Sequence, residues 1–301
     1  MLTSDLSIGQ VTALLAEGRL ALRTGPFLFR IRSSIPAISR GLTRLYARHT
    51  VEVDPPFSDF HVSLERSGGV RYLFRPQVRF LLDEWTPFKP LPLTQAFAML
   101  EWGMNWCIAN HAHHYLVLHA ALVAKGDRAL LLPGAPGSGK STLCAALVQR
   151  GWRLFSDELA LFDPATAEVV AVPRAVGLKN RSIEVIRHFA PAARIGPVAR
   201  DTAKGSVAHM AVPEGQEEGG APARVRWIVF PAFTEGAEEQ IEPVTPARTM
   251  LELIEHAFNY SVLGERGFHL LGRVVQEAEG FRCTYGELEQ VVERMEALAA
   301  K

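Results

Sequence analysis

The sequence predicts an α/β protein (α+β overall) in which a smaller strand-rich N-terminal region, residues 1–92, precedes a phosphate-loop domain, residues 93–301. Two observations lead to this prediction. Apolar and polar residues alternate through much of the first ninety or so residues, as they do in strands with one buried face. Further along, an apolar run, a glycine-rich loop and a helix-like segment follow one another around residues 134–142, which is typical of a strand leading into a phosphate-binding turn.

The composition is that of a globular chain with a sizeable core. Hydrophobic residues make up 48% and charged residues 21% of the 301 residues, and the formal net charge is +0. This balance predicts no nucleic-acid partner and no attraction to an anionic membrane. No apolar run reaches the roughly 18–20 residues that span a bilayer, and the start of the chain lacks the pattern of a signal peptide. Isolated cysteines indicate reduced, buried thiols, so we expect a cytoplasmic protein; they are Cys107, Cys144 and Cys283.

The N-terminal region divides into short elements at turn signals. Helical spacing of apolar residues and alternation between turns distinguish the helices from the strands. A Ser-Gly-Gly sequence between two alternating runs predicts a hairpin over 60–74. The predicted helices cover 8–15 and 35–45, and the predicted strands cover 20–22, 27–31, 60–65, 71–74 and 78–83.

A long helix is expected over 93–112. Its apolar side chains occur on most sides, which suggests burial between two layers. Three histidines, His111, His113 and His114, follow at its end. A His-rich tract can bind metal, but no Cys, Asp or Glu lies at ligand spacing, so a helix C-terminal turn is the favoured interpretation.

Residues 134–142 fit the phosphate-loop pattern G-x-x-x-x-G-K-[ST]. Glycines in such a loop let backbone N–H groups turn inward around a polyphosphate, and the following helix N-terminus adds a favourable dipole. Lys140 would reach the β- and γ-phosphates, and the Ser141 hydroxyl would ligate Mg²⁺. The alternative is a Gly/Ser/Pro turn that matches the pattern by accident. The predicted nucleotide-binding residues are Gly134, Ala135, Pro136, Gly137, Ser138, Gly139, Lys140, Ser141 and Thr142.

An acidic pair, Asp157-Glu158, ends the strand predicted over 152–156. We expect this strand beside the one that precedes the phosphate loop. Ligands bind at the carboxyl ends of strands in α/β sheets, so the acidic pair is a candidate for a role in the site. The alternative is a strand-end pair that caps a turn. The other expected elements are strands at 115–124, 129–132, 159–162, 169–172 and 225–231, and helices at 143–148, from 182, and at 246–258, 268–278 and 286–301.

Three features together resemble the catalytic core of HPr kinase/phosphorylase. His119 lies on the strand candidate upstream of the loop, the phosphate loop follows, and residues 150–158 bring the acidic pair on the strand after it. The order of these features is distinctive, because a generic phosphate-loop enzyme usually places its acidic magnesium residue further along the chain. The closest resemblance is to the branch called HPr kinase-related kinase A, and it extends to the segments 173–180, 204–209 and 258–260.

The resemblance implies a fold like that of phosphoenolpyruvate carboxykinase, with the phosphate loop set in a mixed sheet. It also implies transfer of the γ-phosphoryl group of ATP to a hydroxyl, with Mg²⁺. By the same resemblance Asp157 binds the acceptor hydroxyl and acts as base, Glu158 assists metal or base, and His119 pairs with the acid. The implied metal ligands are Ser141, Asp157 and Glu158. The chain lacks a segment like the glycine-rich one that the parent family uses for dephosphorylation, which argues against phosphorylase activity.

Basic residues downstream are candidates for contacts to the γ-phosphate or to a phosphate of the acceptor. They are Arg174, Lys179 and Lys204. Each of them is equally well explained as an ordinary surface side chain. The alternating segment 205–208 lies between Lys204 and His209, and we expect it to form an active-site flap.

The expected function is that of an ATP-dependent kinase acting on a hydroxyl of a peptide, a carrier protein or a small molecule. The alternative is a non-catalytic ATP-binding assembly protein of a biosynthetic cluster. A motor-type NTPase is disfavoured, because the sequence shows no second acid-ended strand of the Walker type and no arginine-finger signature. The expected cofactors are ATP and Mg²⁺, and the expected partners are the nucleotide and the acceptor, without nucleic acid or membrane. The parent family is hexameric, so a homo-oligomer stays open.

Overall fold

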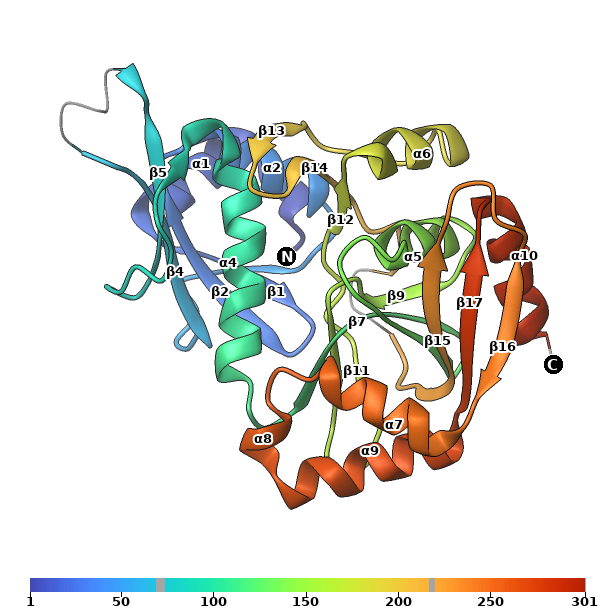
Figure 1. Cartoon of the computed structure of the whole chain (residues 1–301). Helices are drawn as coiled ribbons and strands as arrows, with labels where there is room; N and C mark the ends of the chain where they lie inside the picture. The colour runs from blue at the N-terminus through green and yellow to red at the C-terminus, as the bar shows by residue number, and fades with distance from the viewer. Residues whose placement is uncertain (69–73, 217–219, 301) are drawn as a thin grey trace.

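The N-terminal part of the chain folds around a six-stranded sheet (Figure 1). The computed structural model describes residues 1–68, 74–216 and 220–300. The strand order is β3-β1-β2-β4-β5-β6; β2 and β4 run parallel, and the other neighbours are antiparallel. The elements are η1 (Thr3–Asp5), α1 (Ile8–Glu17), β1 (Leu20–Thr24), β2 (Phe27–Ser33), α2 (Pro36–Leu45), β3 (Val51–Val53), β4 (Phe60–Arg66), β5 (Gln77–Leu82) and β6 (Leu91–Pro92).

Local sequence signals begin and end the first helices. At the start of α1 the Gln10 N–H donates to Ser7 Oγ and the Ser7 N–H donates to Gln10 Oε1, which is a capping box. Gly18 ends the helix in the left-handed region, with φ 71°. Pro36 lies in the first turn of α2, where its missing N–H removes no intrahelical bond.

Helix α4 (Ala96–His111), which follows η2 (Leu93–Gln95), packs against this first sheet. Met104 of α4 belongs to the same buried cluster as Phe80 of β5. Gly103 allows the close approach, because a Cβ there would lie 2.1 Å from the Phe80 ring. Figure 1 shows α4 running between the first sheet and the second one. The helix is therefore buried between layers, as its apolar sides predicted, while the domain boundary after residue 92 stays a prediction.

An eight-stranded mixed sheet forms the second part. Its strand order is β11-β10-β7-β8-β15-β17-β16, with β9 also paired to β7. Strands β8, β15 and β17 run parallel, and the other pairs are antiparallel. The chain is thus an α/β protein with mixed sheets. The elements are β7 (Leu116–Lys125), β8 (Arg128–Pro133), α5 (Lys140–Gln149), β9 (Arg153–Ser156), β10 (Leu159–Phe162), β11 (Val169–Val170), β15 (Arg224–Phe233), β16 (Gln240–Val244), α7 (Pro246–Glu255), α8 (Tyr260–Leu263), α9 (Glu265–Glu277), β17 (Glu279–Tyr285) and α10 (Leu288–Ala299).

Successive residues of β8 face two different helical layers. Leu130 and Leu132 lie in one buried cluster with residues of α5 and α10, whereas Ala129 and Leu131 lie in another with residues of α7 and α9. Side chains alternate between the two faces of a strand, so these helix pairs cover opposite faces of the sheet (Figure 1). A strand buried on both faces has a continuous apolar sequence, which explains the run at 129–132.

A third sheet, β12-β14-β13, is antiparallel and packs on α5. Val176 of β12 and Ala208 of β14 lie in the same buried cluster as Leu143 of α5. The segment expected to form a flap is therefore part of β14, the central strand of this sheet. Residues Val207 to Met210 of this strand are all buried, so both of its faces are covered. The elements are β12 (Val176–Lys179), α6 (Arg181–Phe189), β13 (Ala199–Thr202) and β14 (Gly205–Met210).

Most of the predicted helices and strands are present, and the exceptions have physical reasons. Strand β4 pairs with β5 rather than with a strand at 71–74, of which residues 71–73 lie outside the described residues. The sequence did not predict β17, which lies between β15 and β16 in the second sheet. Its apolar residues, Phe281, Cys283 and Tyr285, do alternate with Arg282 and Thr284, but the strand begins two residues after α9 ends, where the sequence predicts a helix through 278. Its place is decided by pairing with two distant strands.

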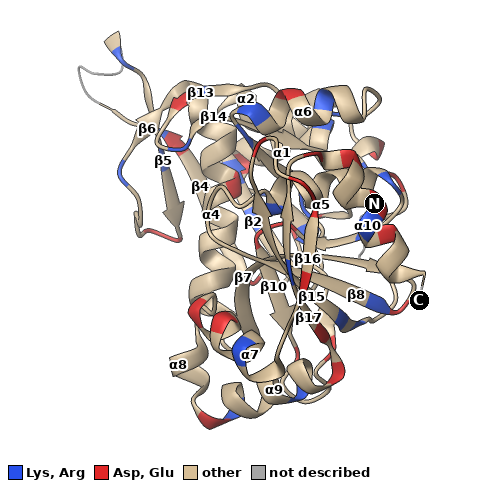
Figure 2. Ribbon diagram, turned by 45° about the vertical axis from the view of Figure 1, so that its right-hand side comes forward, with Lys and Arg blue, Asp and Glu red and all other residues tan. Residues whose placement is uncertain are grey.

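Both signs of charge are interspersed on the surface helices. Figure 2 shows Lys or Arg together with Asp or Glu on α6, α7 and α9. This distribution agrees with the formal net charge of +0. Within the described ranges, no helix combines the length and the hydropathy needed to cross a membrane.

Candidate functional site

The phosphate loop, residues 134–142, connects β8 to α5. Gly137 and Gly139 have φ values of 90° and 94°, a region that L side chains rarely adopt. The Ser138 N–H donates to the Ala135 carbonyl at 3.2 Å, and Gly139 is the N-cap of α5. The unbonded N–H groups of the first helical turn therefore lie at the end of the loop, as in helix N-termini that bind anions.

Two polar groups inside the loop are incompletely satisfied. Among the hydrogen bonds of the described residues, the buried Ser138 Oγ has none. Gly134 leaves room for that hydroxyl, because a Cβ there would lie 2.7 Å from it. The Lys140 ammonium carries three donors and donates to the Gly134 carbonyl at 3.0 Å, although the residue is 7% exposed. Unused buried donors of this kind fit a polyphosphate.

Gly139 is also constrained by Tyr285 of β17. The Tyr285 hydroxyl donates to the Gly139 carbonyl at 3.3 Å. A Cβ at Gly139 would lie 2.2 Å from the Tyr285 hydroxyl oxygen. Gly137 has a similar φ, but a Cβ there meets no atom within 4 Å. The two glycines therefore differ in their surroundings and not in their backbone conformation.

Replacing Gly139 with alanine should destabilise the protein more than replacing Gly137 with alanine. Both changes force an L side chain into the left-handed region, at a cost of about 1–2 kcal/mol, and Gly139→Ala must also displace Tyr285. Urea unfolding of the two variants measures the difference. Equal losses of unfolding free energy would show that Tyr285 does not restrict the loop.

The acidic pair lies in the turn between β9 and β10. Both strands pair with the same edge of β7, through Leu122 with Ser156 and through His119 with Leu159. The expectation that the acid-bearing strand lies directly beside the loop strand is wrong, because β7 lies between β9 and β8. An antiparallel β7 brings the C-terminal end of β9 alongside His119 instead.

Burial and neighbouring charges give the two carboxyl groups different pKa values. Asp157 is 8% exposed, and its Oδ2 accepts the Gly177 N–H at 2.7 Å. Burial, together with the neighbouring Glu158, raises the pKa of Asp157 above its usual value. Burial acts in the same direction on Glu158, but the charges of Lys179 and Lys204 outweigh it and lower the pKa of that carboxyl. Asp157 is thus the better proton acceptor, and Glu158 stays ionised.

The loop lysine shares the electrostatic environment of the acidic pair. Burial is the main reason that the pKa of Lys140 is lowered, with Lys179 acting in the same direction. The charges of Glu158 and Asp157 counteract this shift. The sequence-predicted lysine and acids, which lie on different elements, are therefore close enough to influence one another.

His119 lies on β7 opposite the start of β10. Burial, with Lys140 second, lowers the pKa of His119 to about 4, and the charge of Glu158 opposes that shift. The His119 ring contacts Phe258 edge-on, with centroids 5.8 Å apart, and the backbone N–H of His119 donates to the His256 carbonyl at 2.7 Å. His119 is consequently a neutral imidazole near neutral pH, placed close to the lysine and the acidic pair.

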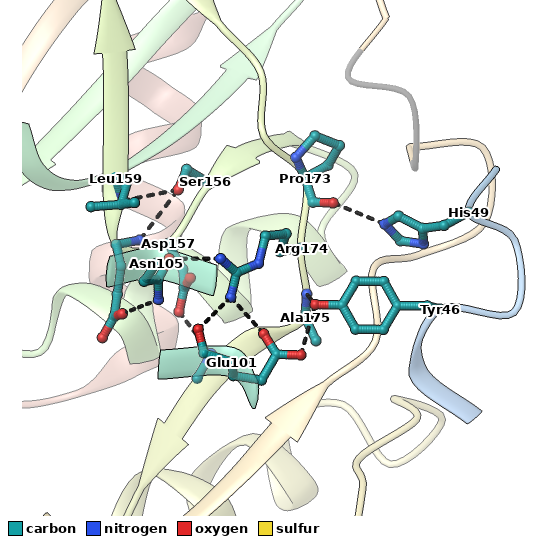
Figure 3. A network of polar contacts seen from close by, with 12 residues as sticks. Tyr46, His49, Glu101, Asn105, Ser156, Asp157, Leu159, Pro173, Arg174 and Ala175 are labelled. Carbon is teal, nitrogen blue, oxygen red and sulfur yellow. Dashed lines mark hydrogen bonds and ion pairs between the residues drawn. The ribbon is translucent and has the colours of Figure 1, made fainter. Parts of the chain in front are cut away.

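The three basic candidates have different surroundings. The Arg174 guanidinium is 6% exposed and bonds inside the protein, to Glu101 and Asn105, as Figure 3 shows. Lys179 Nζ lies 3.5 Å from Glu158 Oε1. Lys204, in the turn between β13 and β14, stacks on the Trp102 ring at 5.3 Å. The structure brings both lysines to the acidic pair, whereas Arg174 is committed to internal partners.

Sequence reasoning missed Glu101 and Asn105 of α4. They lie one turn apart, and they are polar residues on a helix that is apolar on most sides. That contrast was the available signal, because a polar side chain in a buried helix needs a partner. The partners, Arg174 and Glu158, lie on later segments and are not apparent from local spacing.

The fold and the site together define an α/β protein with mixed sheets, in which a glycine loop, a buried lysine and an acidic pair lie within reach of one another's charges. No family model matches the chain, and no curated protein sequence matches it either. No group of three or more His, Cys, Asp or Glu side chains among the described residues is arranged to hold a metal ion. Mg²⁺ is commonly bound through one or two carboxylates together with phosphates, so the acidic pair and Ser141 are a donor set of suitable chemistry.

Proposed function

We propose that the chain is an ATP-dependent kinase that transfers the γ-phosphoryl group to a hydroxyl, with a phosphate-loop fold of the HPr kinase and phosphoenolpyruvate carboxykinase type. One observation carries the proposal. Asp157 and Glu158 are adjacent carboxylates whose pKa values are shifted in opposite directions beside the loop lysine. Titratable pairs whose environments separate their pKa values are typical of acid–base sites. A pair that merely caps a turn needs no such separation.

Each group has a role in this reaction. Lys140 and the N–H groups of the loop bind the β- and γ-phosphates, and Ser141 with Glu158 would hold Mg²⁺, which neutralises charge on the phosphates. Asp157 accepts the proton of the acceptor hydroxyl. The new bond joins the hydroxyl oxygen to the γ-phosphorus, the bond from that phosphorus to the β-γ bridging oxygen breaks, and ADP leaves.

The cationic side chains around the acidic pair support an anionic substrate. Lys179 and Lys204 both act on the pKa of Glu158 and of Lys140, so their charges reach the space between the loop and the acids. We assign them to the γ-phosphate or to a phosphate on the acceptor. The acceptor class is a hydroxyl of a peptide, a carrier protein or a small molecule.

Incubation with γ-labelled ATP and candidate acceptors tests the proposal. Label appearing on an acceptor hydroxyl supports the kinase function. Label appearing in free phosphate alone would contradict it. Nucleotide binding without any turnover would favour the alternative, a non-catalytic ATP-binding assembly protein.

Replacing Lys140 with methionine should weaken ATP binding by roughly 10- to 100-fold without lowering the stability of the nucleotide-free protein. Hydrogen bonds to charged groups contribute about 1.5–3 kcal/mol each. The pKa of Lys140 is lowered chiefly by burial, so its charge is unfavourable in the folded state and an apolar stem of similar length removes that cost. Calorimetric titration and thermal unfolding measure the two effects.

Lys89→Met is the matched control, because Lys89 is exposed and lies between β5 and β6. It should leave ATP affinity unchanged. A Lys140→Met variant with wild-type affinity would remove the phosphate-binding role from the loop lysine.

A further inference from the structure

Asn105 of α4 connects a buried ion pair to the acidic turn. Its Nδ2 donates to Glu158 Oε2, and its Oδ1 accepts from Arg174 Nη1 at 2.9 Å. We propose that Asn105 is a positioning residue that fixes the orientation of the Glu158 carboxylate. Through this side chain, α4 contributes to the site. This inference rests on the proposed function, which gives Glu158 a role in holding Mg²⁺.

The two neighbours of Asn105 determine how its amide is oriented. A guanidinium can only donate hydrogen bonds, and an ionised carboxylate can only accept them. The amide oxygen must therefore face Arg174, and the amide nitrogen must face Glu158. A reversed amide would place two acceptors together on one side and two donors on the other, so one orientation is strongly favoured.

Arg174 is itself held firmly, which keeps Asn105 in place (Figure 3). Its Nη2 donates to Glu101 Oε2 at 2.6 Å and to the Glu101 carbonyl at 2.9 Å. Glu101 precedes Asn105 by one helical turn, so both side chains extend from the same face of α4. The Tyr46 hydroxyl, at the end of α2, donates to Glu101 Oε1 at 2.7 Å. A chain of bonds thus runs from α2 to the acidic turn.

The other oxygen of Glu158 has a looser partner. Lys179 Nζ lies 3.5 Å from Glu158 Oε1, and the lysine side chain is 34% exposed. A long, half-exposed lysine stem loses conformational entropy when it is held in place. Asn105 is therefore the rigid partner of the Glu158 carboxylate. At Oε1, a metal ion can replace Lys179 as the partner of the oxygen.

Titration of Mg²⁺ into the full-length protein with ATP, followed by calorimetry, tests the proposal in Asn105→Ala and Asn105→Ser. Both side chains are too short to join Arg174 to Glu158, and water can fill the half-buried space. We expect the half-saturating Mg²⁺ concentration to rise about 10- to 100-fold, the range for residues that orient metal ligands. Kinase assays should show a lower kcat with an unchanged KM for the acceptor. Asn110→Ala, on the exposed end of the same helix, should match the wild type in both assays.

A purely structural role predicts a different result. Partial unfolding would reduce the amplitude of the titration without moving its midpoint. Midpoints in both Asn105 variants that coincide with the wild type would overturn the positioning role while leaving the proposed function intact. A wild-type titration that coincides with Mg²⁺ binding to ATP alone would instead overturn the proposed function, and this inference with it.

Discussion

Replacing Asp157 with asparagine should reduce phosphoryl transfer by about 10²- to 10⁴-fold, the usual contribution of a general base, while ATP affinity stays at the wild-type level. Asparagine has the same shape and keeps an oxygen that can accept the Gly177 N–H, which now bonds to Asp157 Oδ2 at 2.7 Å. It lacks the carboxylate to which we assign the proton of the acceptor hydroxyl. Transfer is measured with γ-labelled ATP, and affinity is measured by calorimetry.

Stability separates this effect from damage to the fold. Burial raises the pKa of Asp157, so its negative charge is unfavourable in the folded protein and the neutral variant should unfold at no lower a temperature. Asp127→Asn is the matched control, because Asp127 is exposed in the turn between β7 and β8. Near-wild-type transfer in Asp157→Asn would rule out the base role.

Replacing Arg174 with methionine should lower the free energy of unfolding by about 3–5 kcal/mol, the typical loss when one partner of a buried ion pair is removed. Glu101 is 2% exposed and lies 2.6 Å from the guanidinium. Without Arg174 its carboxylate is buried and unpaired. Burial lowers the pKa of Arg174, but the charge of Glu101 outweighs it and raises that pKa above its ordinary value. Urea unfolding measures the loss.

Two further variants identify the origin of that loss. Arg174→Met combined with Glu101→Leu removes both charges and should recover part of the stability, because no charge stays buried, although the Tyr46 hydroxyl loses its acceptor. Arg187→Met breaks a surface pair with Glu184 whose side chains are 43% and 62% exposed, and it should cost less than about 1 kcal/mol. A double variant as unstable as Arg174→Met alone would contradict the ion-pair explanation.

Local sequence patterns predicted much of the fold. The apolar run at 129–132, the glycine loop and the following helix became β8, the phosphate loop and α5, because each depends on neighbours in the chain. The α/β class followed from these segments together with the alternation of apolar and polar residues in the first ninety or so residues. Strand β17 and the small sheet of β12, β13 and β14 were not predicted. Strands β12 and β17 pair with strands distant in sequence, and the alternation within β14 and β17 does not by itself identify those partners.

The candidate site was predicted in its residue types but not in its arrangement. The sequence indicated Lys140, Asp157 and His119, yet it placed the acid-bearing strand beside β8, where the structure has β7. It also left Arg174 as either a phosphate contact or an ordinary surface side chain, whereas the guanidinium is buried and bonds to Glu101 and Asn105. An arginine in an exposed loop and one in a buried ion pair have the same local sequence signal, so spacing alone does not distinguish them.

The sequence by itself determined the strand, glycine loop and helix around residues 134–142, because glycine spacing and the flanking apolar segments are local properties. Only the tertiary structure decided how the two carboxyl groups of the acidic pair differ. The opposite pKa shifts of Asp157 and Glu158 depend on burial and on the positions of Lys179 and Lys204. Asn105 reaches Glu158 across 53 positions of the chain. Electrostatic environments are produced by such distant contacts, which exist only once the layers have packed together.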